Sequence, residues 1–210
     1  MKVEREVRRL GQVDARLPLA LLRAIRQQDT PPELQPDEPV SAFFPARLGL
    51  SEVVEDQIRQ FEKLARRGRA VDEGRAAALL ELIVRRTDAA AVLAAAGEAL
   101  AMMVYGRSSK LRRRLLARLP APFRRREALR ALRSSLQELL GAADVTLRRN
   151  PIEVRARDAI TARVGAYGGA CQLYSTTLSR FFDLWGVAES GVSHLSCQRH
   201  GDEACVWKME

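Results

Sequence analysis

The sequence predicts an α+β fold in which a helical N-terminal half packs on a small antiparallel sheet. Apolar residues recur at helical spacing through most of residues 51–140, whereas residues 145–157 alternate with the period of two that is typical of strands. After one further helical stretch, the last 23 residues regain strand character. The C-terminal third is therefore predicted as a β-β-α-β-β unit behind the helices.

The first 50 residues are predicted to form a separate N-terminal segment. A chain of 210 residues has room for one domain with a full core and an additional arm. Residues 1–28 begin with a charged stretch and continue into a short helix with an apolar side, and five prolines between residues 29 and 45 deny backbone donors. We therefore assign a helix and a proline-rich arm to residues 1–50 and one α+β domain to residues 51–210. The apolar side of the helix consists of Leu17, Leu19, Leu21, Leu22 and Ile25.

The helices of the main domain are bounded by capping residues and prolines. Ser51 is an N-cap candidate with acidic residues after it, and Asp88 can cap a later helix. The Pro120-x-Pro122 pair ends a short basic helix, and Gly141 is a C-terminal stop. These signals predict helices over residues 51–67, 71–86, 88–105, 111–119 and 125–140.

Two hairpins and one helix are predicted for the C-terminal third. Asn150-Pro151 is a turn signal between two alternating stretches, and Gly201-Asp202 is a second one near the end of the chain. Between them, apolar and aromatic residues share one helical face. The predicted strands cover residues 145–149, 152–157, 188–198 and 204–209, and the predicted helix covers residues 171–185.

No membrane-spanning or secreted character is predicted. The most apolar stretch, residues 89–105, is interrupted by Glu98 and falls short of the ~20 apolar residues that span a bilayer. The start of the chain is charged from its second residue and has no apolar signal region. We therefore expect a cytoplasmic protein.

All three cysteines lie in the last 40 residues and form a C-x22-H-x2-C-x7-C pattern with His194. Four thiolate and imidazole ligands are typical of a structural zinc site, in which no position is left for water or substrate. A hairpin that turns at Gly201 would bring Cys197 and Cys205 together on one face. An offset of three would turn His194 to the other face of a regular strand, so a bulge near Leu195-Ser196 is required. The predicted zinc ligands are Cys171, His194, Cys197 and Cys205.

Other interpretations of these residues stay open at the sequence level. Buried free cysteine behaves as a small apolar residue and needs no metal. A disulfide would leave one of the three cysteines unpaired, and no secretory signal indicates an oxidising compartment. His200, in the predicted turn, could replace His194 as the fourth ligand.

A second candidate site is the basic stretch over residues 107–133, which contains eleven basic residues and one acidic residue. Clustered arginines can pair with phosphates or carboxylates, so nucleic acid, an anionic membrane surface and an acidic protein partner all fit. A solvated arginine-rich face is the alternative, because only four of the 35 basic residues in the chain are lysine. The candidate residues are Arg112, Arg113, Arg114, Arg124, Arg125 and Arg126.

No catalytic constellation is found. The chain has no nucleophile elbow, P-loop or dinucleotide fingerprint, and the glycines at 165, 168 and 169 lack the strand and helix that would make a phosphate cradle. An enzyme is therefore the less favoured function class.

A resemblance to the 4-vinyl reductase domain family is carried by the run CQLYSTTLSRFFDLWG, which begins at Cys171, and by the ending SHLSCQRHGDEACVW. The family is named after a bacteriochlorophyll-biosynthesis protein and is found as the sensor domain of phenol-responsive transcriptional activators. In those sensors a helix cysteine, an acidic residue and two hairpin cysteines hold zinc. The same positions here are the four predicted ligands, with His194 in place of the acidic residue. The resemblance is absent from residues 1–50.

The resemblance implies a binding domain more than an enzyme. Relatives in the broader fold include subunits of vesicle-tethering transport particles. These relatives are typically dimers with an apolar cavity. The resemblance therefore implies a homodimer here and a pocket for an apolar small molecule. The expected function is a zinc-stabilised sensor or adapter domain that acts through protein partners. The alternatives are a nucleic-acid-binding regulator that uses the basic stretch and a tetrapyrrole-related reductase or carrier. Candidate pocket residues are Tyr105, Tyr167, Tyr174, Phe181, Phe182 and Trp185.

Overall fold

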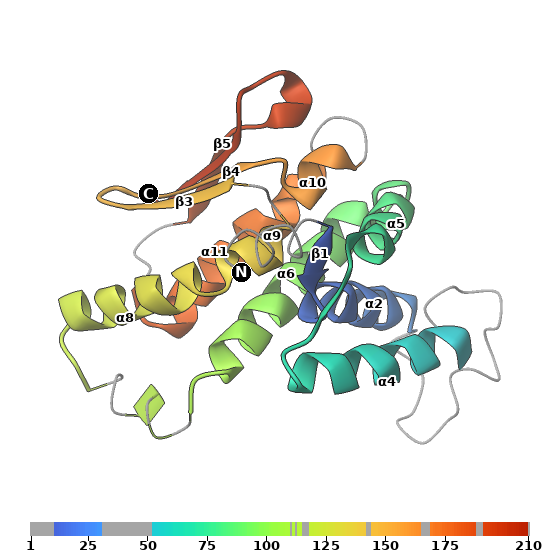
Figure 1. Cartoon of the computed structure of the whole chain (residues 1–210), viewed down its shortest axis with the longest axis horizontal. Coiled ribbons are helices and arrows are strands. Elements are labelled where there is room, and N and C mark those ends of the chain that lie inside the picture. Colours follow the sequence, from blue (N-terminus) through green and yellow to red (C-terminus); the bar gives the residue numbers. More distant parts are fainter. Residues whose placement is uncertain are drawn as a thin grey trace, which may run out of the picture.

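The computed structural model confirms an α+β fold with two small antiparallel sheets (Figure 1). It describes residues 11–30, 52–109, 111, 113–114, 118–141, 144–164, 169–187 and 191–209. The helices are α2 (Arg16–Asp29), α4 (Glu52–Arg66), α5 (Glu73–Val84), α6 (Ala89–Gly106), α8 (Ala121–Arg133), α9 (Leu136–Leu140), α10 (Ile160–Arg163) and α11 (Gln172–Leu184). The strands are β1 (Gln12–Asp14), β2 (Ala70–Asp72), β3 (Asp144–Arg149), β4 (Ile152–Arg157), β5 (Val192–Ser196) and β6 (Cys205–Met209). Two 3-10 turns, η2 (Gly169–Cys171) and η3 (Gln198–His200), complete the list.

The larger sheet joins the two predicted hairpins in the order β3-β4-β6-β5. Strands β3 and β4 pair up to Arg149 opposite Ile152, with Asn150-Pro151 as the connection, as predicted. Strand β6 then pairs with β4 on one side and with β5 on the other, so that the second hairpin is added to the first. This leaves β3 and β5 as the two edges of the sheet.

The predicted bulge is present in β5. The register pairs His194 with Trp207 and Ser196 with the preceding residue of β6, Val206, so Leu195 has no partner on β6. Leu195 is 58% exposed, which is consistent with a residue displaced outward from the ladder. The extra residue turns His194 and Cys197 toward the same side of the strand.

The helical core is built around α2, α6 and α11. Helix α11 contacts α6 on one side and β5 on the other, and α6 also contacts α2 (Figure 1). The close approach of α6 to α11 depends on Gly97, where an added Cβ would lie 2.7 Å from the backbone oxygen of Leu173 and 2.8 Å from the Cβ of Thr176. The apolar faces predicted for the first and last helices are buried in this core.

Residues 11–30 contribute directly to this core. Strand β1 pairs with β2, and Leu17 and Leu21 of α2 are fully buried. The sequence boundary at residue 50 therefore does not separate α2 from the body of the fold. The proline-rich arm over residues 31–50 lies outside the described residues.

Several predicted helices differ in their limits. The helix expected to begin at residue 71 is preceded by β2 and starts at Glu73, because β1 and β2 pair there. The helix expected over residues 125–140 is two helices, α8 and α9, separated at Ser134 and Ser135, and α8 begins earlier, next to Pro122. Gly141 ends α9 in the left-handed conformation, as predicted. The helix expected over residues 111–119 falls partly outside the described residues.

Helix α6 is the one described helix that is long and apolar enough to cross a membrane by length and composition. The sequence prediction was that this stretch falls short. In the structure one side of the helix, which includes Val92, Leu100 and Val104, is buried against α2 and α11. A core helix of a folded domain meets the same criteria of length and composition, so the finding by itself places no helix in a membrane.

Candidate functional site

Four side chains from separate elements meet at the C-terminal end of the fold. Cys171 ends the 3-10 turn η2, and His194 lies in β5. Cys197 follows β5 directly, and Cys205 is the first residue of β6. Their potential ligand atoms all lie within 4.8 Å of one another. The structure therefore brings together the four residues predicted from the spacing.

The distances between the three sulfur atoms match those of a tetrahedral metal site. The Sγ atom of Cys171 lies 3.8 Å from that of Cys197 and 3.9 Å from that of Cys205, and the third pair is 4.0 Å apart. At a metal–sulfur distance of about 2.3 Å, tetrahedral geometry places two sulfurs about 3.8 Å apart. A disulfide would require about 2.0 Å. The three cysteines are free, so the group could hold a metal ion.

The His194 ring is held by the sheet. It stacks on the ring of Trp207, its partner on β6, with 5.2 Å between ring centroids and an interplanar angle of 20°. Its Nε2 atom is buried without a hydrogen-bond partner among the described residues. His200, the alternative ligand, is exposed in η3 and does not belong to the cluster.

A short turn fixes the distance between Cys197 and Cys205. The backbone N–H of Cys197 donates to the Asp202 carboxylate at 2.7 Å, and the N–H of His200 donates to the Cys197 carbonyl at 2.8 Å. Gly201 adopts φ +94°, in the region that favours glycine. The turn thus returns the chain to β6 with Cys205 beside Cys197.

The surroundings of the three thiols shift their pKa values in different directions. Hydrogen bonding to Cys205 and burial raise the pKa of Cys171, and burial raises the pKa of Cys197. Hydrogen bonds from Cys171 and His194 lower the pKa of Cys205 to about 4, against the opposing effect of burial. A divalent cation bound there would favour the thiolate form of all three cysteines.

The three cysteines of the cluster are buried, His194 is partly buried, and a hydroxyl lies beside the cluster. Cys171 and Cys205 are fully buried, and Cys197 is 2% exposed. The buried Thr161 hydroxyl lies 3.4 Å from the Cys171 sulfur. A site filled by four protein ligands is suited to holding structure together and offers no position for a substrate.

The aromatic residues predicted to line an apolar pocket pack against one another and the sheet. Tyr105 meets Trp185 edge to face at 5.6 Å between ring centroids, and Phe181 contacts both Phe182 and Trp185. Tyr174 is buried, donates its hydroxyl to the Leu139 carbonyl at 2.6 Å, and has its pKa raised by burial. Tyr167 lies outside the described residues. A ligand pocket among these side chains stays a prediction.

The predicted basic residues have different surroundings. The guanidinium of Arg113 lies over the Tyr105 ring, 5.0 Å from its centroid, and Arg114 is exposed. Arg124 is partly buried beside Gly186, whereas Arg125 donates to the Arg149 carbonyl at 2.7 Å. Arg126 lines a groove between α8 and β3. Arg112 lies outside the described residues.

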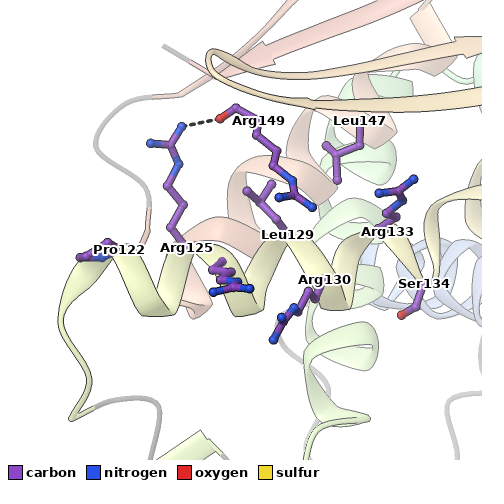
Figure 2. Close-up of a pocket in the computed structure, with 9 residues that line it drawn as sticks. Pro122, Arg125, Leu129, Arg130, Arg133, Ser134, Leu147 and Arg149 are labelled. Atoms are coloured by element: carbon purple, nitrogen blue, oxygen red, sulfur yellow. Dashed lines mark hydrogen bonds between the residues drawn. The ribbon is translucent and has the colours of Figure 1, made fainter.

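This basic groove also contains residues that were not predicted from the sequence. Besides Arg125 and Arg126, its walls include Arg130 and Arg133 from α8 and Arg149 from β3, and Figure 2 shows Leu129 and Leu147 between them. Spacing of three and four along α8 could have indicated Arg130 and Arg133 as neighbours of Arg126. No pattern among neighbouring residues could have indicated Arg149, because only the tertiary structure places α8 against the β3–β4 hairpin.

Comparison with known protein families, with curated proteins and with solved structures gave no significant match.

Proposed function

We propose that Cys171, His194, Cys197 and Cys205 bind one zinc ion, which ties the start of α11 to the β5–β6 hairpin in a non-enzymatic domain. The observation that carries this proposal is the set of three sulfur–sulfur distances of 3.8 to 4.0 Å. Zinc bound there would supply a redox-inactive tetrahedral crosslink.

The ligand set favours zinc over other cations. Magnesium and calcium prefer oxygen ligands, and no oxygen belongs to the cluster. Three thiolates and one imidazole in tetrahedral arrangement are typical of structural zinc. Copper(I) is the other soft cation that thiolates select, so the identity of the metal belongs to the test.

The resemblance to the 4-vinyl reductase domain family supports the wider part of the proposal. Three of the four ligand positions that the resemblance gives are cysteines here, and the cluster lies in the C-terminal region, where the sequence pattern predicts a β-β-α-β-β unit. On this basis we propose a sensor or adapter domain that forms a homodimer and acts through protein partners in the cytoplasm. Light scattering of the metal-loaded protein tests the dimer, and a monomeric mass at micromolar concentration would contradict it.

The metal content of protein purified without added metal tests the zinc site. We expect about one zinc per chain in the wild type and loss of that zinc in C197S and H194A, because each variant removes one of four ligands. The matched control is H200A, which removes the exposed histidine three residues after Cys197 and should retain the metal. Wild-type protein without metal, or loss of metal in H200A, would contradict the assignment.

A further inference from the structure

We propose that the basic groove, which lies between α8 and β3, binds the phosphate group of an amphipathic small molecule, with the apolar part of that molecule lying on the leucines of the groove. The inference is independent of the zinc site. The groove opens at the β3 edge of the sheet, and the candidate ligands on β5 and β6 lie at the other side of the order β3-β4-β6-β5.

The dimensions of the groove suit a small molecule. Its volume is about 600 Å³, within the range of ~300–1,000 Å³ that ligand sites occupy. One wall is a single face of α8, and the other is the edge strand β3 (Figure 2). The Arg125 guanidinium, which donates to the Arg149 carbonyl at 2.7 Å, ties the two walls together at one end. The separation of the walls is thus set by the protein before a ligand binds.

The charge of the groove is strongly positive and largely uncompensated. Five arginines line it, and none of its lining residues is acidic. The neighbouring Glu127 pairs with Arg130. Within the described part of the chain, Arg126, Arg133 and Arg149 have no carboxylate partner. Three guanidinium groups without counter-charges around one groove favour an anionic ligand.

Phosphate fits this arrangement better than a single carboxylate does. Figure 2 shows Arg133 from the helix and Arg149 from the strand reaching into the space between their elements, on either side of Leu147. A carboxylate has two oxygens and one charge, whereas a phosphate monoester has three terminal oxygens and a charge of about −1.5 to −2. Arginines that approach from opposite walls can each take a different edge of the phosphate.

The apolar floor indicates that the ligand is more than a bare anion. Leu129 is 7% exposed, Leu147 is partly buried, and Pro122 closes one end. A ligand that bound only through phosphate would leave the exposed surfaces of Leu147 and Pro122 in contact with water. Burying an alkyl chain there would remove apolar surface from water and so tighten binding. A nucleic-acid backbone offers phosphates and little apolar surface, which makes it the less suitable occupant.

The test compares binding of four probes to the full chain by calorimetry at low salt. The probes are dodecyl phosphate below its micelle concentration, inorganic phosphate, the neutral dodecyl maltoside, and vesicles of phosphatidylcholine with one third phosphatidic acid. We expect dodecyl phosphate to bind at least tenfold more tightly than inorganic phosphate or dodecyl maltoside. Binding to the vesicles as well would assign the phosphate to a lipid in a bilayer, whereas binding to dodecyl phosphate alone would assign it to a free amphiphile.

Neighbouring arginines on β3 provide the matched variants. Arg149 lines the groove, and Arg148 is exposed on the opposite face of the strand because side chains alternate. R149Q and R133Q should weaken dodecyl phosphate binding at least tenfold, and R148Q should leave it within about twofold. All variants should keep the circular dichroism spectrum and thermal unfolding of the wild type, which shows that they fold.

Three results would overturn the proposal. The first is a wild-type protein that binds none of the phosphate probes. The second is that R148Q and R149Q weaken dodecyl phosphate binding equally, which would indicate a general effect of positive charge on this surface. The third is a single-stranded oligonucleotide that displaces dodecyl phosphate at equal phosphate concentration, which would assign the groove to nucleic acid.

Discussion

The two ends of the fold are held together by different means. The helical core of α2, α6 and α11 depends on apolar packing, with fully buried residues such as Leu17 and Leu100 and a close helix contact at Gly97. The C-terminal hairpin β5–β6 is short, joins the sheet through the pairing of β6 with β4, and contributes His194, Cys197 and Cys205 to the cluster. The first region has many separate apolar contacts, whereas the zinc site proposed in the second depends on four ligands together.

This difference follows from the number of residues that each region can bury. Helices of 14 to 18 residues can bury several side chains on one face. Strands β5 and β6 have five residues each, and β5 has no fully buried residue. A hairpin of that size is at most marginally stable alone, so a crosslink has a large effect on it.

Removing the metal should produce the largest difference between the two regions. A structural zinc site binds with about 10–16 kcal/mol in isolated peptides, which is comparable with the ~5–15 kcal/mol stability of a whole domain. After chelation under reducing conditions, we expect amide hydrogens of β5, β6 and η3 to lose protection from exchange, while those of α2 and the middle of α6 keep most of theirs. Hydrogen exchange with and without chelator measures this.

The control is hydrogen exchange of the C197S variant with and without chelator. This variant should already show the exchange pattern of the metal-free protein before chelator is added. Equal loss of protection in β6 and α6 would mean that the fold is one cooperative unit, and the contrast between the two regions would be wrong.

Gly97→Ala should disturb the helical core and leave the metal site intact. The added methyl would lie 2.7 Å from the Leu173 carbonyl oxygen, so α6 and α11 must separate. Overpacking of this kind costs about 1–3 kcal/mol, which outweighs the ~1 kcal/mol by which alanine favours a helix over glycine. Chemical denaturation should show the loss, and metal content should not change.

The control for this variant is Gly106→Ala at the end of the same helix. Among the described residues, no atom lies within 4 Å of the position of its added Cβ, so we expect a neutral or slightly stabilising effect. A destabilisation by Gly106→Ala as large as that by Gly97→Ala would show that the cost comes from the helix itself and has no connection with the contact to α11.

Thr161→Val should have the smallest effect and should act on metal affinity. The Thr161 hydroxyl lies 3.4 Å from the Cys171 sulfur, and loss of such a supporting group lowers metal affinity by about tenfold or more. Competition with a chromophoric chelator measures the change. The control is Thr177→Val, because that buried hydroxyl donates to the Leu173 carbonyl within α11 and does not touch the cluster. Equal affinities of the two variants would contradict a role for Thr161 at the site.

The agreement between sequence and structure is best where the signal is local. Alternation and the Asn150-Pro151 turn predicted β3 and β4, and Gly141 predicted the end of α9. The bulge at Leu195 could be predicted as well, because four ligands at those spacings cannot meet without it. Strand β1 was missed because three residues carry too short a pattern, and only pairing with β2 makes them a strand.

By itself, the sequence determined the type of each main element and the identity of the candidate metal ligands, because helical periodicity, strand alternation and cysteine spacing are properties of neighbouring residues. Only the tertiary structure decided that α2 enters the common core, that the predicted aromatic residues pack against one another, and that Arg149 faces α8 across a groove. Those outcomes depend on which surfaces meet, and the meeting of surfaces distant in sequence is set by packing of the whole chain.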